Sequence, residues 1–186
     1  MEHEVQIEHH TPVNRRIGIL IAVMAAVLAF TEMAARNADT DVVRETVEAS
    51  DTWAFYQAKS IRAAMFRADA QALQLQAGQG KDPASVEKTI ADWEATAARE
   101  DSEPSTGEGR KELAIHARAI EKHRDDRNAA KESYEYASGA LELGILLASS
   151  AVVTGLLPLA FLGGTMGALG AIAAVLGWVA PHMLGG

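Results

Sequence analysis

Three long, uncharged apolar stretches constrain this chain more than any other feature. One covers residues 17–31, and the other two share residues 143–183. A helix needs about 20 apolar residues to cross a hydrocarbon core of roughly 30 Å. The C-terminal region is long enough for two crossings, with a predicted break at Leu162, Gly163 and Gly164. The sequence therefore predicts an all-α membrane protein with three transmembrane helices, at 15–36, 139–162 and 163–184.

The first predicted span raises the question of a cleaved export signal. Thr31 is followed by helix-forming residues without a good small-x-small cleavage site, so we expect a retained anchor. Residues 17–31 give only about 22 Å of helix, and an extension to residue 36 brings the span to a full crossing. The segment 1–14, rich in His and Glu, is predicted to be a disordered tail.

Two acidic residues stand beside the predicted spans. Glu32 lies in the last turn of the first span, four residues before Arg36, where the two side chains can pair. Glu142 lies directly before the apolar part of the second span. Each has two interpretations: an intramembrane acid that handles a proton or cation, or an interfacial side chain that reaches water.

The region between the first two spans, 37–138, is polar and has interleaved charges of both signs. Interleaved charge is typical of a solvated helical surface, whereas nucleic-acid binding requires clustered Lys and Arg. With a net charge of −8 for the whole chain, we expect no nucleic-acid partner. The chain has no cysteine, which excludes disulfides, thiolate catalysis and cysteine-based metal sites.

The polar region is predicted to form three helices, at 39–77, at about 83–98 and from about 110 onward into the second span. A flexible break is predicted at 100–109. On the first helix, apolar or small residues recur at steps of four and three, which is a heptad seam, with one extra residue before Ala58 that would locally loosen a supercoil. Its members are Val43, Val47, Ser50, Ala54, Ala58, Ile61, Met65, Ala68, Ala72 and Leu75. A coiled-coil-like hairpin with a broken return arm fits these lengths, and a three-helix bundle is the alternative.

The second and third helices of this region also have predicted seams. On the second helix the seam is Val86, Ile90, Trp93 and Ala97. On the third it is Leu113, His116, Ile120, His123, Arg127, Ala130, Tyr134, Ala137 and Leu141. His116 and His123 are two turns apart, too far to chelate one ion from a single helix. We therefore interpret them as polar seam residues that fix register or oligomeric state, and we expect no metal or other cofactor.

One block of the first helix has an unusual composition. Its aromatic and polar residues are Asp51, Trp53, Phe55, Tyr56, Gln57, Lys59 and Arg62. Trp53 and Tyr56 are interpreted as packing anchors for the returning helix or another subunit, and the alternative is a recognition surface for a peptide or a small polar ligand. The block, the single span before it and the closing pair of spans resemble the bacterial membrane-protein family described as domain of unknown function 4337. The resemblance implies location and topology, and it brings no established activity or site residue.

The last two spans are rich in small residues, which permit close helix contacts in lipid. They are Gly144, Ala148, Ala151, Gly155, Gly163, Gly167, Gly170, Ala174 and Gly177. Pro158 is predicted to kink or end the second span. We expect tight hairpin packing rather than a pore.

These patterns favour a multi-pass protein of the bacterial inner membrane that acts as a self-associating, non-enzymatic scaffold, adaptor or sensor component. The Ala-rich seams bury little area each, so a homo-oligomer in the lipid bilayer is expected. The alternative is a small channel or transporter subunit that uses Glu32 and Glu142. An enzyme is least favoured, because the candidate acid–base groups lie on helices without a visible nucleophile, cofactor loop or metal set. The count of Lys and Arg beside the spans favours a cytoplasmic polar region.

Overall fold

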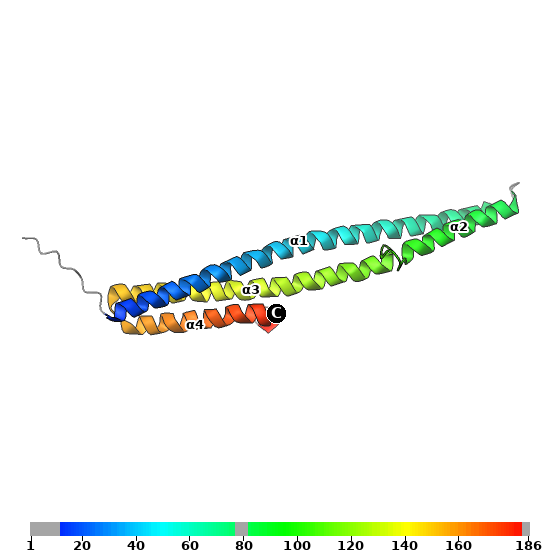
Figure 1. Ribbon diagram of the computed structural model, residues 1–186. Helices are drawn as coiled ribbons and strands as arrows, with labels where there is room; N and C mark the ends of the chain where they lie inside the picture. The colour runs from blue at the N-terminus through cyan, green and yellow to red at the C-terminus, as the bar shows by residue number, and fades with distance from the viewer. Residues whose placement is uncertain (1–11, 77–81, 184–186) are drawn as a thin grey trace, which may run out of the picture. The chain divides into compact units, whose positions relative to one another are not determined.

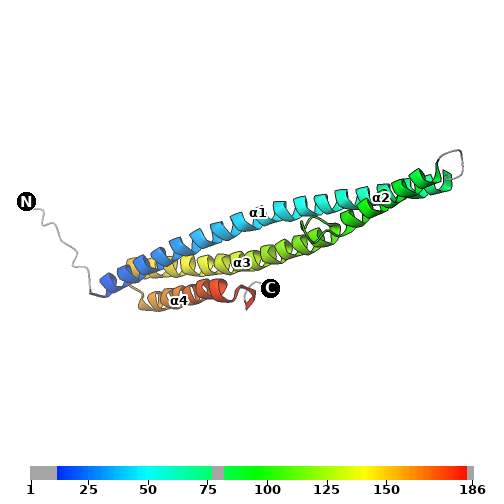
Figure 2. The ribbon, with the colours of Figure 1, turned by 45° about the vertical axis from the view of Figure 1, so that its right-hand side comes forward.

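The computed structural model describes residues 12–76 and 82–183 and is all-helical within them. Four α-helices follow one another: α1 (Pro12–Gln76), α2 (Pro83–Asp101), α3 (Arg110–Thr154) and α4 (Leu157–Val179), with a short 3-10 helix, η1 (Pro181–Met183), at the end (Figures 1 and 2). The predicted all-α fold is therefore confirmed. Three of the helices, α1, α3 and α4, are long and apolar enough to cross a membrane. The tail residues 1–11 and the predicted helix end at Gly78 and Gly80 lie outside the described residues.

The chain divides into two compact units, each described by itself. We call Met1–Val42 with Asp125–Gly186 the apolar unit and Val43–Arg124 the polar unit. In the apolar unit, the first part of α1 lies beside α4 and the second part of α3 (Figures 1 and 2). Its core is formed by Ile17, Met24, Leu141 and Ala148, with partly buried aliphatic residues around them.

Close helix packing in the apolar unit depends on glycines of α4. A Cβ atom on Gly163 would lie 2.6 Å from the carbonyl oxygen of Gly144, and one on Gly170 would lie 2.8 Å from that of Ala137. Real Cβ contacts are not this short, so α3 and α4 approach each other through backbone. Gly177 is equally close to Ser133. The predicted tight packing of these two helices is confirmed.

The position of the turn between α3 and α4 corrects the sequence prediction. We expected the break at Leu162, Gly163 and Gly164, but these residues lie inside α4. The chain turns instead after Thr154, where Gly155 has a φ of 73° and its N–H donates to the Ala151 carbonyl at 2.9 Å. A left-handed glycine followed by proline in the first turn of the next helix is the usual way to end one helix and start another. Pro158 has that place in α4, so it lies at the start of this helix and does not kink or end α3.

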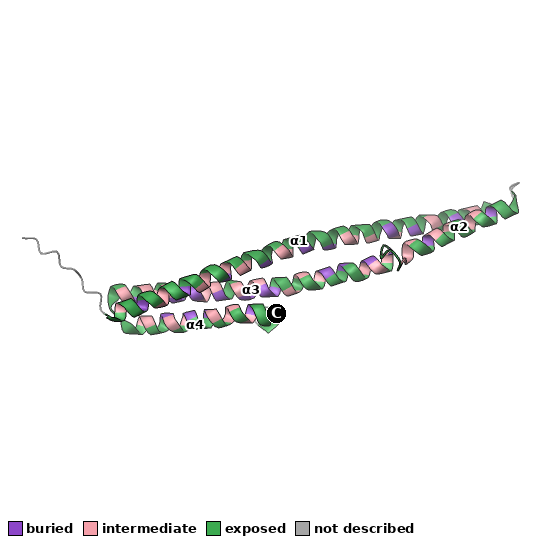
Figure 3. Ribbon diagram, in the orientation of Figure 1, coloured by how far each residue is buried: buried purple, intermediate pink, exposed green. Residues whose placement is uncertain are grey.

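In the polar unit, the buried face of α1 is not the predicted one. Most of the buried and half-buried residues, which we call the inner seam, follow steps of four and three, and the half-buried Trp53 and Ser60 lie next to them. The inner-seam residues are Glu45, Ala49, Thr52, Tyr56, Lys59, Ala63, Phe66, Ala70 and Leu73. The predicted seam residues are exposed: Ile61 is 61 % exposed and Leu75 is 82 % exposed. Figure 3 shows the buried face as separate purple bands along this helix, with green between them.

The α2 prediction is confirmed, and the α3 prediction is confirmed in part. Asp82 caps α2 by accepting from the N–H of Ala84, and Pro83 occupies its first turn. The predicted stripe of α2 is buried or half-buried, although the helix continues to Asp101. On α3, Leu113 and Ile120 are buried as predicted, but the intervening seam position is the fully buried Ala117. His116 is exposed, because steps of four and three from Leu113 lead to Ala117 and then Ile120. The predicted seam positions His123 and Arg127 are exposed as well.

Candidate functional site

The aromatic part of the candidate interaction block faces the start of α3. The indole Nε1–H of Trp53 donates to the Glu121 carboxylate at 2.9 Å. The Trp53 ring meets the edge of the Tyr56 ring, with centroids 5.3 Å apart and planes at 79°. The Arg110 guanidinium lies 5.9 Å from the Tyr56 ring centroid. Edge-to-face rings and a cation over a ring each add directional attraction to the burial of apolar area. These contacts connect the block to α3 within the polar unit.

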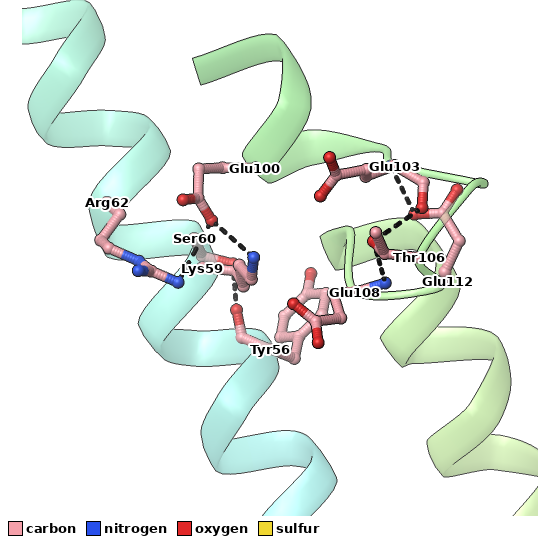
Figure 4. A network of polar contacts seen from close by, with 9 residues as sticks. All are labelled: Tyr56, Lys59, Ser60, Arg62, Glu100, Glu103, Thr106, Glu108 and Glu112. Carbon is pink, nitrogen blue, oxygen red and sulfur yellow. Dashed lines mark hydrogen bonds and ion pairs between the residues drawn. The ribbon is translucent and has the colours of Figure 1, made fainter. Parts of the chain in front are cut away.

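The basic part of the block faces the end of α2. Lys59 Nζ and Arg62 Nη2 lie 3.1 and 3.3 Å from the same oxygen of Glu100, as Figure 4 shows. The Lys59 side chain is only 8 % exposed and that of Glu100 13 %. A buried charge is costly unless an opposite charge compensates it, so these two side chains fix the contact between α1 and α2. The Lys59 ammonium also lies 5.4 Å from the Phe55 ring centroid.

A second cluster of charges closes the loop between α2 and α3. Asp101 pairs with Arg110 at 3.1 Å and also with Arg67. One Glu112 oxygen accepts from the Ser102 hydroxyl at 2.7 Å. The other accepts from the Glu103 backbone N–H at 3.2 Å, as Figure 4 shows. The Ser102 hydrogen bond is the main reason that the pKa of Glu112 is lowered, because it stabilises the ionised carboxylate.

This loop was expected to be a flexible break. Within it, Gly107 has a φ of 73° and its N–H donates to the Glu103 carbonyl at 2.9 Å, so the chain makes a defined turn. The Thr106 hydroxyl accepts from the Glu108 N–H at 3.2 Å (Figure 4). The loop is therefore tied by its own hydrogen bonds and by Glu112 of α3.

The family comparison covers almost all of this architecture. The family model described as Domain of unknown function (DUF4337) matches residues 13–180, from the first turn of α1 to the end of α4. The chain belongs to this family. No curated protein and no solved structure matches this chain significantly. The role of this DUF4337 chain must therefore be argued from its own geometry.

The remaining residues of the candidate block point elsewhere in this DUF4337 chain. Asp51 and Gln57 are exposed, and Phe55 is 39 % exposed. The block thus separates into a packed group of Trp53, Tyr56 and Lys59 and an outward group that contacts solvent. A single ligand-binding surface would require both groups on one face, which the helix does not provide.

Both candidate seam histidines are exposed rather than buried in a seam, and the His123 side chain, 55 % exposed, pairs with a buried acid. His123 Nδ1 is 2.6 Å from Glu45 Oε1, and the Glu45 side chain is only 6 % exposed. His116 is exposed on α3. Within residues 12–76 and 82–183, no group of three or more His, Cys, Asp or Glu side chains could hold a metal ion.

The two acids beside the spans are both accessible. The expected pair of Glu32 and Arg36 is present at 3.3 Å, with side chains 41 % and 81 % exposed. Glu142 is exposed on α3. Two further ion pairs in the apolar unit were not predicted from the sequence. Asp39 pairs with Lys131 at 2.6 Å, and Asp126 pairs with His182 at 2.7 Å. The hydrogen bond from Lys131 to Asp39 raises the Lys131 pKa.

Sequence reasoning also missed Glu45, Glu100 and Glu121, the acids that pair with the block and with His123. A usable signal was present, because Glu45 and Lys59 occupy one position of a heptad pattern whose other position holds Ala49 and Ala63. Charged residues at seam positions indicate partners of opposite charge on the facing helix. The identity of those partners depends on the register of the hairpin, which a single sequence does not specify.

Proposed function

We propose that this protein is a self-associating, non-enzymatic scaffold, adaptor or sensor component of the bacterial inner membrane. In this proposal α1, α3 and α4 cross the bilayer, and the polar unit mediates association between copies. The observation that carries the proposal is an exposed apolar heptad stripe on α1, on the opposite side of the helix from the inner seam.

Membrane insertion is supported by the surface of the apolar unit. Large apolar side chains there are exposed rather than buried: Phe30 is 69 %, Phe161 75 % and Trp178 80 % exposed. Water-soluble proteins rarely leave contiguous surfaces of this kind open. A lipid environment removes the penalty, and Trp near a helix end is typical of the interface.

The stripe, which we call the outer stripe, consists of the residues that sequence analysis assigned to a seam. Its large members are exposed: Val43, Val47, Ile61, Met65 and Leu75. Outer-stripe positions lie two residues from inner-seam positions, as Ile61 does from Lys59 and Ala63. At about 100° per residue, they therefore face roughly opposite directions. The stripe extends over about 48 Å of helix, at 1.5 Å per residue.

A second copy of the same chain fits this stripe. Copies with the same topology in one membrane present α1 in the same direction, so a parallel pair is the relevant geometry. With Ala58 and Ile61 at the a and d positions, the flanking pairs of a parallel coiled coil are Gln57 with Arg62 and Ala64 with Asp69. Neither pair opposes like charges, so the flanks permit association while the apolar stripe drives it.

A non-enzymatic role is supported by the clustered charges of the polar unit, which form ion pairs between its helices. Glu100 is compensated by Lys59 and Arg62, and Asp101 by Arg67 and Arg110. Both acids are held by basic partners within the helix contacts. Such networks are the usual means of fixing register between helices.

The test compares two charged substitutions on the outer stripe with a matched control. Light scattering of the full chain in mild detergent should give an oligomer mass for the wild type and a monomer mass for the Ile61→Glu/Met65→Glu variant. Ile115, on α3, is 69 % exposed and lies off the stripe. Ile115→Glu should therefore keep the wild-type mass, and circular dichroism should show unchanged helix content in all three.

Two results would contradict the proposal. A wild-type monomer over a wide range of detergent and protein concentrations would remove self-association. An unchanged oligomer mass in the double variant would remove the outer stripe as the interface.

A further inference from the structure

The apolar unit has an open groove of about 480 Å³ between the first turns of α1 and the first half of α4. Val13, Ile17 and Leu20 of α1 and Leu157, Phe161 and Ala168 of α4 contribute its apolar lining. Gly164 leaves space within it, because a Cβ atom there would meet only Leu20 Cδ2, at 3.6 Å. The volume falls within the range of about 300–1,000 Å³ that is usual for ligand sites.

One charged side chain, Arg16, also lines this groove. Arg16 is exposed, and among the described residues it forms no ion pair with a carboxylate. The groove therefore combines an aliphatic surface with a guanidinium that has no carboxylate partner among the described residues. Arg16 directly precedes the apolar stretch of α1, which is the position of a residue at the headgroup level.

We propose that this groove binds an anionic phospholipid, with an acyl chain along the apolar lining and the phosphate beside Arg16. The proposal rests on the membrane insertion proposed above. Lipid is the occupant because the groove opens on the surface that faces the bilayer. An anionic headgroup is preferred because the choline cation of a zwitterionic lipid offsets the attraction between phosphate and guanidinium.

The neighbouring arginine provides a matched control. Arg15 is in the same helical turn but lines a different groove, of about 460 Å³, with Gly18, Ile21, Ser149 and Val152. Arg15→Gln and Arg16→Gln change the net charge equally, so a general attraction to anionic membranes weakens equally in both. Only a specific site distinguishes them.

Native mass spectrometry of the delipidated full chain measures binding of phosphatidylglycerol and phosphatidylcholine with identical acyl chains. We expect the wild type to bind phosphatidylglycerol about fivefold more tightly, the effect of one basic residue near a membrane surface. Arg16→Gln should remove this preference, and Arg15→Gln should retain it. Gly164→Leu fills the groove and should reduce binding of both lipids, whereas Gly18→Leu, whose Cβ meets nothing within 4 Å, should not.

Equal affinities for the two lipids in the wild type would overturn the proposal. So would equal losses in Arg15→Gln and Arg16→Gln, because they would show a surface-charge effect only. A Gly164→Leu variant with altered oligomer mass and unchanged lipid binding would show a contact between helices of two copies instead. The same spectra report the oligomer mass, so loss of the lipid preference with unchanged mass contradicts the lipid site alone and leaves self-association standing.

Discussion

Single polar residues of the inner seam make contacts between helices that apolar residues usually make in a helical hairpin. Glu45, Tyr56 and Lys59 stand at seam positions, and each has a partner on α2 or α3. Paired polar seam residues fix register, because a slipped hairpin leaves a buried charge without compensation. The small seam residues Ala49 and Ala63, 3 % and 1 % exposed, allow the helices to approach closely enough for these pairs to form.

The hydrogen bond between Trp53 and Glu121 gives the first prediction. Trp53→Phe keeps an aromatic ring but removes the donor, so we expect a loss of about 1–2 kcal/mol in the free energy of unfolding. Trp53→Ala also removes the ring and should cost about 3 kcal/mol. Chemical unfolding followed by circular dichroism measures both. The exposed Gln57→Ala variant is the control, and wild-type stability in Trp53→Phe would show that the hydrogen bond contributes nothing.

The lowered pKa of Glu112 gives a second prediction at this scale. Because the pKa in the folded state lies below the reference value of 4.5, the ionised carboxylate contributes stability that is fully present above about pH 4.5. That contribution is lost as the pH falls through the folded-state pKa. Limited proteolysis of the loop between α2 and α3, measured relative to an unstructured peptide of the same loop sequence, should therefore accelerate in acid with a protease that is active from acid to neutral pH, such as proteinase K. Glu112→Gln should be cut faster than the wild type near neutral pH and show a smaller change on acidification. The exposed Glu108→Gln is the control, and identical profiles for Glu112→Gln and the wild type would contradict the prediction.

At the scale of elements, the sequence predicts which segments are helical, but it predicts the contacts between the helices only in part. The starts of α2 and α3 are predicted correctly, because Asp82 with Pro83 is a strong start signal and Pro104 and Gly109 interrupt the chain before Arg110. The buried face of α1 is predicted wrongly, because two heptad stripes run along opposite sides of this helix. The more apolar stripe is exposed, and the buried one contains Glu45 and Lys59. Apolar periodicity alone cannot detect burial that depends on ion pairs with distant segments.

The turn between α3 and α4 shows the same limit for glycine. Gly163 was predicted to lie in the break and Gly155 to be a packing residue, because the sequence does not distinguish a glycine needed for its positive φ from one needed for close packing. The structure assigns the first use to Gly155 and the second to Gly163. For the candidate site, the sequence located the block on α1 but not its acidic partners, which lie at least 38 residues away along the chain. Glu100, for example, is 41 residues from Lys59 and 38 residues from Arg62.

Adjacent glycines of α4 provide a matched prediction for this element. Gly163→Ala places a Cβ 2.6 Å from the Gly144 carbonyl and should force α3 and α4 apart. We expect a loss of about 1–3 kcal/mol, typical of overpacking. Gly164→Ala places its Cβ at an ordinary 3.6 Å from Leu20 Cδ2 and should be neutral or slightly stabilising, since alanine favours helix. Thermal unfolding in detergent checks the difference, and equal melting temperatures for the two variants would contradict the close contact.

At the scale of the whole molecule, the chain alternates between segments suited to lipid and segments suited to water. α1 and α3 each combine an apolar part with a charged part in one uninterrupted helix. A continuous helix leaves no unpaired backbone N–H or C=O groups between an apolar segment and a polar one. Such a helix would therefore avoid the cost of unsatisfied backbone groups at a membrane surface. In the proposed membrane topology, charge pairs such as Asp39 with Lys131 lie where these helices leave the bilayer.

The last prediction concerns topology. If α3 and α4 both cross the membrane, the turn that contains Leu156 must lie on the side opposite the loop that contains Ser105. Both residues are exposed, and the chain has no cysteine of its own, so Leu156→Cys and Ser105→Cys each provide one reactive thiol. In oriented membrane vesicles, an impermeant maleimide should label only one of the two variants before permeabilisation and both afterwards. Since Lys and Arg near the predicted spans are most numerous in and beside the polar region 37–138, we expect Ser105→Cys to be the one that reacts from the cytoplasmic side. Labelling of both variants from the same side would show that α3 and α4 do not form a transmembrane hairpin.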